Sequence, residues 1–484
     1  MPVTIVAKKS NRPKIIHVAD DVAPVGSPLL DQDRSLLANA SVTPLEYIRL
    51  DELKPNPRSV KKHPERQIAL LAENVACFGF TQPIAIDQNN VIVLGNARYE
   101  AASRAKLEHV PTIRLLHLSP TQKRALAIAD NKLSVIGEWD EAILAEELQF
   151  LSDPALDLRF DIQILGFETV EIDNILEAAR PRNSPASPDD ALPDIPQYSV
   201  STRGDVWIME GHRLLCGDAC NADDYRTLMG NDIADIVFTD PPYNVPNAGH
   251  VTSRRNVREF AMAAGEMSST EFSGFLGQSF SAIVKHIRPG AVVFTCMDWS
   301  HLSELRTACD PIFGHPRNMI VWVKSNAGMG SFYRSQHEFI VPYVLPGAGP
   351  INNFGLGGKG RYRTNVWQYP GANAFGRKRD EELAMHPTVK PVALVADALK
   401  DCSNRRDIVL DPFGGAGTTM IAAERTGRSA RLIEYDPLYC DVIVQRWQSS
   451  TGKTARIAET NETFEQVKAR RSSETMKQDE GVRS

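Results

Sequence analysis

The sequence predicts a doubly wound α/β domain that follows a smaller α+β domain. Between residues 197 and 452, short apolar strand patterns alternate with helical patterns, which is typical of a largely parallel sheet covered by helices. Two loops rich in proline or glycine directly follow two of these strands, where open sheets of this kind bind ligands. Residues 181–196 carry Pro, Ser and Asp without apolar periodicity, so we expect a linker there.

The composition indicates a soluble globular chain of more than one domain. The chain has 484 residues, 42% of them hydrophobic and 24% charged, and it contains no apolar run long enough to span a membrane. An odd, scattered set of seven cysteines favours reduced thiols in the cytoplasm. Cys216 and Cys220 lack the further ligands of a metal site, so we expect no metal. The net charge of −6 does not exclude a nucleic-acid partner, because a local basic face is sufficient.

The first domain is expected at residues 45–180, after a leader of residues 1–44 that shows no periodicity. Its elements are predicted in the order strand, helix, two strands, helix, strand and helix. Ser119 and Pro120 are typical of the N-cap and first position of the last of these helices. The corresponding stretches are "YIRLDELKPNP", "PERQIALLAENVACFGF", "PIAID", "VIVLG", "NARYEAASRAKL", "VPTIRLL" and "SPTQKRALAIADNKL".

The second domain is expected at residues 197–452, followed by a polar tail at residues 453–484. Its predicted strands are "DIVFT", "AVVFTC", "MIVWVK", "FIVPYVL", "DIVLD" and "SARLIEY". Helical segments such as "STEFSGFLGQSFSAIVKHI" and "PVALVADALKDC" lie between them. This alternation is the main evidence for the doubly wound sheet.

One candidate binding loop, "DPFGGAGTT" at residues 411–419, follows the strand "DIVL". Its glycines permit a tight turn and a close approach of the backbone to a ligand, although a glycine turn by itself also fits a purely structural role. The spacing matches neither a P-loop nor a dinucleotide loop. Glu434 ends the next strand, where an acid can accept hydrogen bonds from a ribose diol. Together these features favour a nucleoside cofactor without a pyrophosphate.

The other candidate loop is Asp240-Pro241-Pro242-Tyr243, directly after "DIVFT". The prolines stiffen the turn and lack N–H donors, so that carbonyl groups can face a ligand. The Asp240 carboxylate and the Pro241 carbonyl can each accept one N–H bond of an exocyclic amino group. Tyr243 can stack on a base that has left the duplex. We therefore predict a site that orients a base amine.

These two loops resemble those of the amino-methylating DNA methyltransferases, whose catalytic motif is Asp/Ser-Pro-Pro-Tyr. Because the catalytic loop precedes the cofactor loop, the order resembles the permuted β group of that family. The segments "LLCGDAC", "IVWVKSNAGMGSFYRSQHEFIV" and "MHPTVKPVAL" resemble the family as well. The resemblance implies a Rossmann-like sheet that binds S-adenosylmethionine and acts on DNA.

The resemblance also implies roles for individual residues. Asp218 is expected near the adenine of the cofactor and Lys390 at its methionine end. The other residues expected to bind the cofactor are Asp411, Phe413, Gly414, Gly415, Gly417, Thr418, Thr419 and Glu434. The residues expected to be catalytic are Asp240, Pro241, Pro242 and Tyr243.

The first domain resembles the ParB/sulfiredoxin-like fold in "LKPNP", "FGFTQPIAID", "VLGNARYEAA" and "VPTIRLL". For DNA contacts, the basic, glycine-rich stretch from residue 347 to residue 384 is the candidate. A charge run is also compatible with an ordinary solvated face. The residues singled out in this stretch are Arg361, Arg363, Arg377, Lys378 and Arg379.

The sequence therefore predicts a cytoplasmic, site-specific DNA methyltransferase that modifies adenine N6 in double-stranded DNA, as in restriction–modification systems. Asp rather than Ser at position 240 favours adenine, and cytosine N4 is the alternative target. The alternative from another class is a DNA-binding regulator with an inactive methyltransferase domain, against which the intact loops count. A homodimer is compatible with the sequence, and no membrane partner is expected.

Overall fold

The chain divides into two compact units, Met1–Ile136 and Gly137–Ser484, which are described separately. The computed structural model describes residues 44–152, 160, 162–179, 192–193, 195–196, 198–245, 263, 265–325, 327, 332–355, 361–370 and 389–482, with side chains up to residue 473. Among these residues, no helix has both the length and the apolar character needed to cross a membrane.

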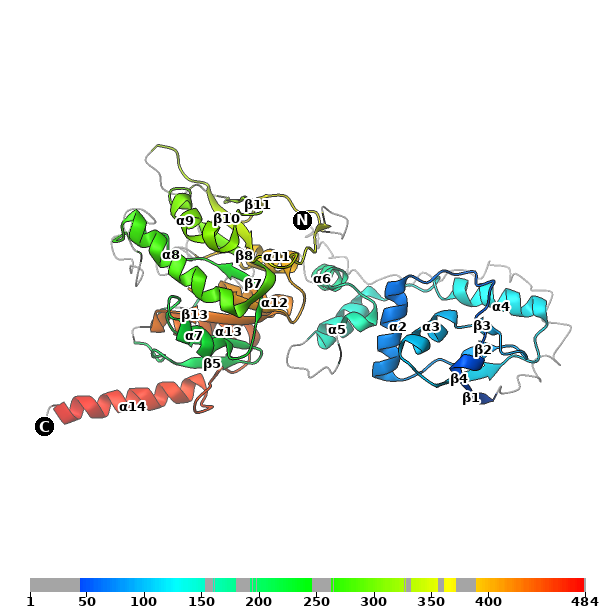
Figure 1. Cartoon of the computed structure of the whole chain (residues 1–484). Coiled ribbons are helices and arrows are strands. Elements are labelled where there is room, and N and C mark those ends of the chain that lie inside the picture. Colours follow the sequence, from blue (N-terminus) through cyan, green and yellow to red (C-terminus); the bar gives the residue numbers. More distant parts are fainter. Residues whose placement is uncertain are drawn as a thin grey trace, which may run out of the picture. The chain divides into compact units, whose positions relative to one another are not determined.

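The first unit has a four-stranded sheet in the order β1-β4-β2-β3 (Figure 1). The isoleucines Ile48, Ile84 and Ile92 form its core with Val110. Every element predicted from the sequence is present, and Ser119 caps α4 as expected. The elements are β1 Leu45–Arg49, η1 Leu50–Glu52, α2 Glu65–Phe78, β2 Ile84–Ile86, β3 Ile92–Leu94, α3 Asn96–Arg104, β4 His109–Arg114 and α4 Pro120–Leu133.

The second unit is built on a ten-stranded sheet in the order β11-β9-β10-β8-β7-β12-β13-β6-β5-β14. The central strands β8, β7, β12, β13 and β6 are parallel to one another, as the α/β prediction requires. The six predicted strands are present, and β5, β6, β11 and β14 are additional. The bounds are β5 Val206–Met209, β6 His212–Cys216, β7 Ala234–Thr239, β8 Ile287–Met297, β9 Ile320–Val323, β10 His337–Val344, β11 Val366–Gln368, β12 Ile408–Asp411, β13 Ser429–Glu434 and β14 Arg456–Ile457.

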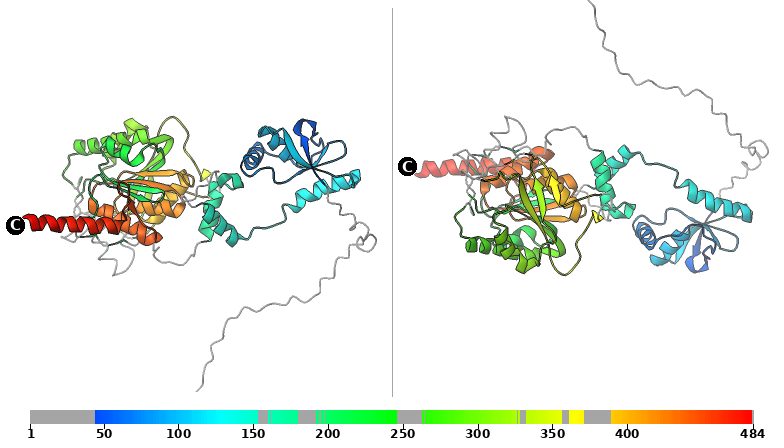
Figure 2. Two further views of the ribbon diagram at one scale, coloured as in Figure 1. Left: turned by 90° about the horizontal axis from the view of Figure 1, so that it is seen from below. Right: turned by 90° about the horizontal axis from the view of Figure 1, so that it is seen from above.

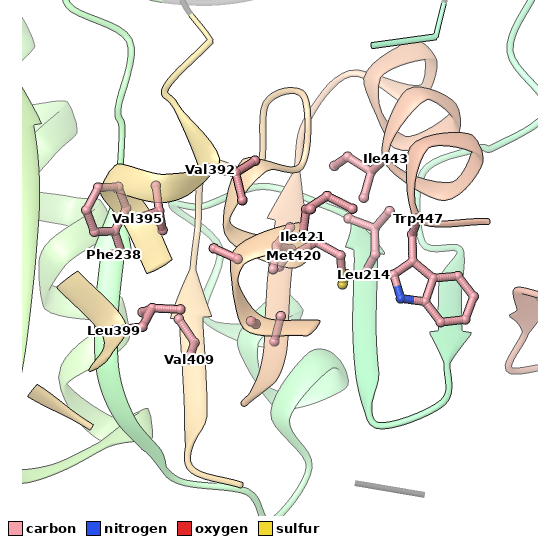
Figure 3. Packing of buried hydrophobic residues seen from close by; sticks show 14 of the residues in the cluster. Leu214, Phe238, Val392, Val395, Leu399, Val409, Met420, Ile421, Ile443 and Trp447 are labelled. Carbon is pink, nitrogen blue, oxygen red and sulfur yellow. The ribbon is translucent and has the colours of Figure 1, made fainter. Parts of the chain in front are cut away.

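Helices cover both faces of this sheet (Figure 2). Alternate residues of β7 enter different cores: Val237 packs with α7, α8 and α9, whereas Phe238 packs with α11, α12 and α13 (Figure 3). Such alternation is what a strand between two helical layers requires. The helices of the second unit are α5 Glu141–Leu151, η2 Ile162–Leu165, α6 Thr169–Ala178, α7 Ala222–Met229, α8 Ser269–Ile283, η5 Val284–His286, α9 Leu302–Phe313, α11 Val392–Cys402, α12 Thr418–Thr426, α13 Pro437–Thr451 and α14 Phe464–Val482.

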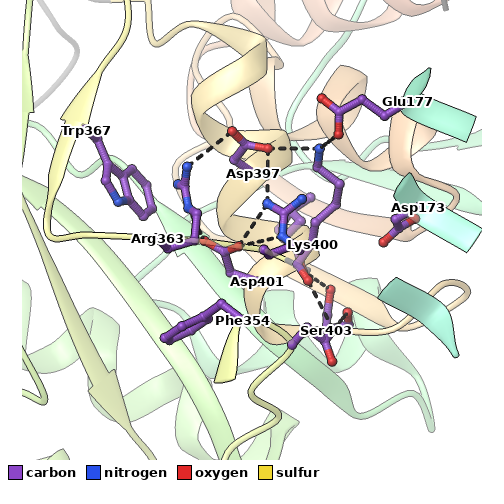
Figure 4. Close-up of polar contacts among 12 residues, drawn as sticks. Asp173, Glu177, Phe354, Arg363, Trp367, Asp397, Lys400, Asp401 and Ser403 are labelled. Carbon is purple, nitrogen blue, oxygen red and sulfur yellow. Dashed lines mark hydrogen bonds and ion pairs between the residues drawn. The ribbon is translucent and has the colours of Figure 1, made fainter. Parts of the chain in front are cut away.

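The division between the units differs from the domain boundary expected at residue 180. Helix α6 belongs to the second unit, where Asp173 forms ion pairs of 2.9 Å with Arg405 and 3.1 Å with Arg428. The Glu177 carboxylate pairs with Lys400 of α11 at 2.6 Å (Figure 4). The composition of residues 181–196 is typical of a linker, but composition does not reveal which surface the preceding helix packs against.

The C-terminal segment also differs from the expected polar tail. Strand β14 pairs with β5, and Phe464 at the start of α14 is buried against Trp207, with ring centroids 5.4 Å apart. Arg471 pairs with Asp205 at 2.5 Å. The core of the second unit therefore continues well past residue 452.

Candidate active site

The sheet order brings the two candidate loops together. Strand β12 lies between β7 and β13, and all three are parallel. The Asp240 loop, the glycine loop and Glu434 therefore lie at the same carboxyl edge, where α/β sheets bind ligands. Residues that are almost 200 positions apart in the chain become neighbours in this way.

A cavity joins these elements and has an empty volume of about 1340 Å³, part of which is open to solvent. Its wall includes residues 240–243, 411–416, 418–419 and 434–436, together with Lys390. The structure thus gathers most of the predicted cofactor and catalytic residues around one space.

The glycine loop keeps its backbone close to the end of β13. Gly415 and Gly417 have φ angles of +52° and +78°, in the left-handed region that favours glycine. The Gly415 N–H donates to Glu434 Oε2 at 2.7 Å. A Cβ atom on Gly417 would lie 3.1 Å from Ile443, so Gly417 supports close helix packing and does not line the cavity.

Two buried carboxyl groups beside the glycine loop have raised pKa values. Burial raises the pKa of Asp411 to about 7, against a hydrogen bond of 2.6 Å from Thr419 Oγ1. Burial likewise raises the pKa of Glu434 to about 7, although the Asp436 and Gly415 N–H groups oppose this effect. Glu434 is therefore poised to lose its proton when hydroxyl donors approach its carboxylate.

Asp240 is held from both of its oxygen atoms. The Tyr243 hydroxyl donates to Oδ1 at 2.7 Å, and Lys390 Nζ donates to Oδ2 at 2.6 Å. Burial raises the pKa of Asp240, although Lys390 opposes this effect. The side chain of Lys390, expected at the methionine end of the cofactor, thus lines the cavity and also contacts the catalytic loop.

Two charged residues that the sequence analysis did not single out complete this cluster. Glu338, on β10, lies 3.1 Å from Lys390 Nζ through its Oε2 atom and also pairs with Lys324, directly after β9. Burial would raise the pKa of Glu338, but the ammonium groups of Lys390 and Lys324 lower it to about 2. A glutamate directly before the apolar run "FIVPYVL" was the available signal, because charged residues are rarely buried unpaired.

Asp218 is not part of the cavity wall, whereas its neighbour Ala219 is. The Asp218 carboxylate accepts a hydrogen bond from the Cys220 N–H at 2.8 Å, which shapes the turn after β6. The predicted contact of Asp218 with the cofactor adenine stays a prediction.

The expected DNA contacts of Arg361 and Arg363 do not fit the structure. Both arginines pair with Asp397 and Asp401 of α11 (Figure 4), and Arg361 is only 9% exposed. The guanidinium group of Arg363 also lies over the Trp367 ring, 4.5 Å from its centroid. Ion pairs inside the protein hold both guanidinium groups, so these groups are not available to bind phosphates. The other predicted DNA contacts, Arg377, Lys378 and Arg379, lie outside the described residues.

Comparison with known families agrees with this architecture. Residues 234–445 match the N6/N4 family described as DNA methylase. Residues 32–132 match the ParB N-terminal domain, and residues 142–203 match a ParB-methyltransferase HTH domain. The last match includes α5 and α6, which pack with the second unit.

Individual relatives cover parts of the chain. The type II methyltransferase M.HpaI of Haemophilus parainfluenzae is 23% identical over 255 residues, which are 49% of this chain and 74% of that protein. The type II methyltransferase M.ScaI of Streptomyces caespitosus is 34% identical over 90 residues, 19% of this chain and 30% of that protein. The crystal structure of the M1.HpyAVI–SAM complex is 20% identical, with a TM-score of 0.35, and covers 48% of this chain and 97% of that one.

The second unit is therefore an α/β domain in which residues 234–445 are similar to the DNA methylases of the N6/N4 family. In this chain the matched region follows the regions that match the ParB N-terminal domain and the ParB-methyltransferase HTH domain. The resemblance inferred from the two loops is confirmed, as is the fold class.

Proposed function

We propose that this chain transfers a methyl group from S-adenosylmethionine to N6 of adenine in double-stranded DNA. The observation that carries the proposal is the position of Asp240 and Tyr243 on the wall of the same cavity as the glycine loop and Glu434. A base amine bound by Asp240 and Tyr243 would lie beside a cofactor bound by the glycine loop and Glu434.

The cavity fits this cofactor by its donor and acceptor groups. The Glu434 carboxylate would accept hydrogen bonds from the ribose hydroxyls, and the Gly414–Gly415 backbone leaves room for the nucleoside. When bound, S-adenosylmethionine supplies an electrophilic methyl group on a sulfonium. The residues of this chain must then orient the amine and exclude competing nucleophiles.

Asp240 would perform the orientation. The lone pair of a base amine is delocalised into the ring, so a carboxylate that accepts one of its N–H bonds aims the nitrogen and stabilises the positive charge that develops on it. Because burial raises the pKa of Asp240, its carboxylate is also a competent acceptor for the proton that the methylated nitrogen releases. The Tyr243 ring would stack on the extruded base.

The test is transfer of labelled methyl to duplex DNA, followed by digestion to nucleosides and identification of the product. We expect N6-methyladenine. N4-methylcytosine would assign the alternative target and contradict the adenine proposal. Cofactor binding without any transfer, across a DNA pool that contains all short sequences, would favour a regulator with an inactive domain.

A further inference from the structure

Asp240 has no oxygen atom without a donor in the described structure. Lys390 Nζ lies 2.6 Å from Oδ2, and the Tyr243 hydroxyl lies 2.7 Å from Oδ1. A carboxylate oxygen can accept more than one hydrogen bond, but an incoming base amine must share these two oxygens with Lys390 and Tyr243. The amine meets less competition for Asp240 when one of these donors turns to another acceptor.

Glu338 is placed to be that acceptor. Its Oε2 atom lies 3.1 Å from Lys390 Nζ and 3.3 Å from the Tyr243 hydroxyl, so both donors are already within reach. The exchange needs only a redirection of hydrogen bonds and no movement of the backbone. Because its pKa is about 2, Glu338 is ionised at every pH at which the protein would be assayed.

The charges of the cluster support the same role. Asp240 and Glu338 supply two negative charges, and Lys390 and Lys324 supply two positive ones. Without the Glu338 charge, Asp240 would be the only carboxylate paired with the buried Lys390 ammonium. Breaking that pair to admit a neutral amine would then leave a buried cation without a counter-ion, which is strongly unfavourable.

We propose that Glu338 is a positioning residue for methyl transfer: it takes the hydrogen bonds of Lys390 and Tyr243 when the base amine binds to Asp240. This inference rests on the proposed function. Glu338 does not line the cavity, so it would act through Lys390 and Tyr243 and not by touching the base or the cofactor. Lys324 pairs with the other oxygen of Glu338, Oε1, so it takes no part in the exchange.

The test compares Glu338→Gln with the matched control Lys324→Met in the full chain. Single-turnover methyl transfer to duplex DNA and titration with S-adenosylmethionine are measured for both. For Glu338→Gln we expect cofactor affinity within about twofold of the parent and a transfer rate lower by about a hundredfold, the usual loss for a preorganised polar contact. For Lys324→Met we expect a rate within about threefold of the parent, because Glu338 keeps its contacts with Lys390 and Tyr243.

Equal losses of rate in both variants would show that Glu338 serves only a structural ion pair, and would overturn the inference. A near-parental rate for Glu338→Gln would overturn it as well, while leaving the proposed function intact. An inactive parent would instead contradict the proposed function. If Glu338→Gln does not fold, Glu338→Asp is measured in its place. Because this variant keeps the charge, cofactor affinity and at least a tenth of the transfer rate should persist. Loss of both the affinity and the rate would contradict the proposal.

Discussion

Replacing Asp173 by Ala should destabilise the second unit strongly, although Asp173 lies far from the cavity in sequence and precedes the expected linker. Asp173 is 4% exposed and pairs with Arg405 and with Arg428, which is fully buried. Burial would raise the pKa of Asp173, but the two guanidinium groups lower it overall, and both carboxylate oxygens accept hydrogen bonds from them.

The magnitude follows from the burial of the pair. Removing one partner of a buried ion pair costs about 3–5 kcal/mol, because the remaining charges have no counter-ion. Glu177 provides a matched control on the same helix: its side chain is 55% exposed and it pairs with Lys400. The Glu177 carboxylate is largely exposed and the buried Lys400 keeps its second partner, Asp397, so Glu177→Ala should cost only about 0–1 kcal/mol.

Urea unfolding followed by tryptophan fluorescence measures this difference in the full chain. All six tryptophans lie after Ile136, so the signal reports the second unit alone. We expect a loss of about 3–5 kcal/mol for Asp173→Ala and less than about 1 kcal/mol for Glu177→Ala. Equal, small effects of both substitutions would refute the placement of α6 as an integral part of the methylase unit.

Three further outcomes are expected. Gly415→Asp should abolish cofactor binding in a calorimetric titration, because it strains a φ angle of +52° and adds a charge beside Glu434; parental affinity would place the cofactor elsewhere. Because burial raises the pKa of Glu434 to about 7 and ribose hydroxyls favour its ionised form, cofactor affinity should weaken about fivefold from pH 7 to pH 6. Glu434→Gln should remove most of this dependence, and an unchanged pH profile would contradict the role of Glu434. Replacing Arg361 and Arg363 with Gln should lower stability in urea while leaving the salt dependence of DNA binding unchanged; a flatter salt dependence would return them to the DNA interface.

The parts of the site that could be predicted from sequence are local in the chain. The Asp240 loop and the glycine loop each follow an apolar strand directly, and parallel strands place such loops at one edge. The cavity therefore follows from two short stretches and the fold class. The contact of the Lys390 ammonium group with Asp240 could not be predicted from the sequence, because it joins residues 150 positions apart.

The parts that could not be predicted depend on long-range packing. Arg361 and Arg363 have the sequence of a basic loop, but their acidic partners on α11 lie 34 to 40 positions further along the chain. The sequence does not reveal that these ion pairs are buried. Glu338 joins this cluster only when β10 pairs with β8 and the fold brings Lys390 within 3.1 Å of its carboxylate. The ion pair of Asp173 with Arg428 could not be predicted from the composition either.

The most direct test of the central claim is single-turnover methyl transfer by Asp240→Ala, alongside titration with S-adenosylmethionine. In the proposed site, Asp240 would supply the acceptor for the amine, whereas the glycine loop and Glu434 would supply most of the cofactor contacts. We therefore predict near-parental cofactor affinity and a transfer rate lower by about a hundredfold or more. Near-parental transfer by Asp240→Ala, with the protein folded by its tryptophan signal, would contradict the assignment of this site.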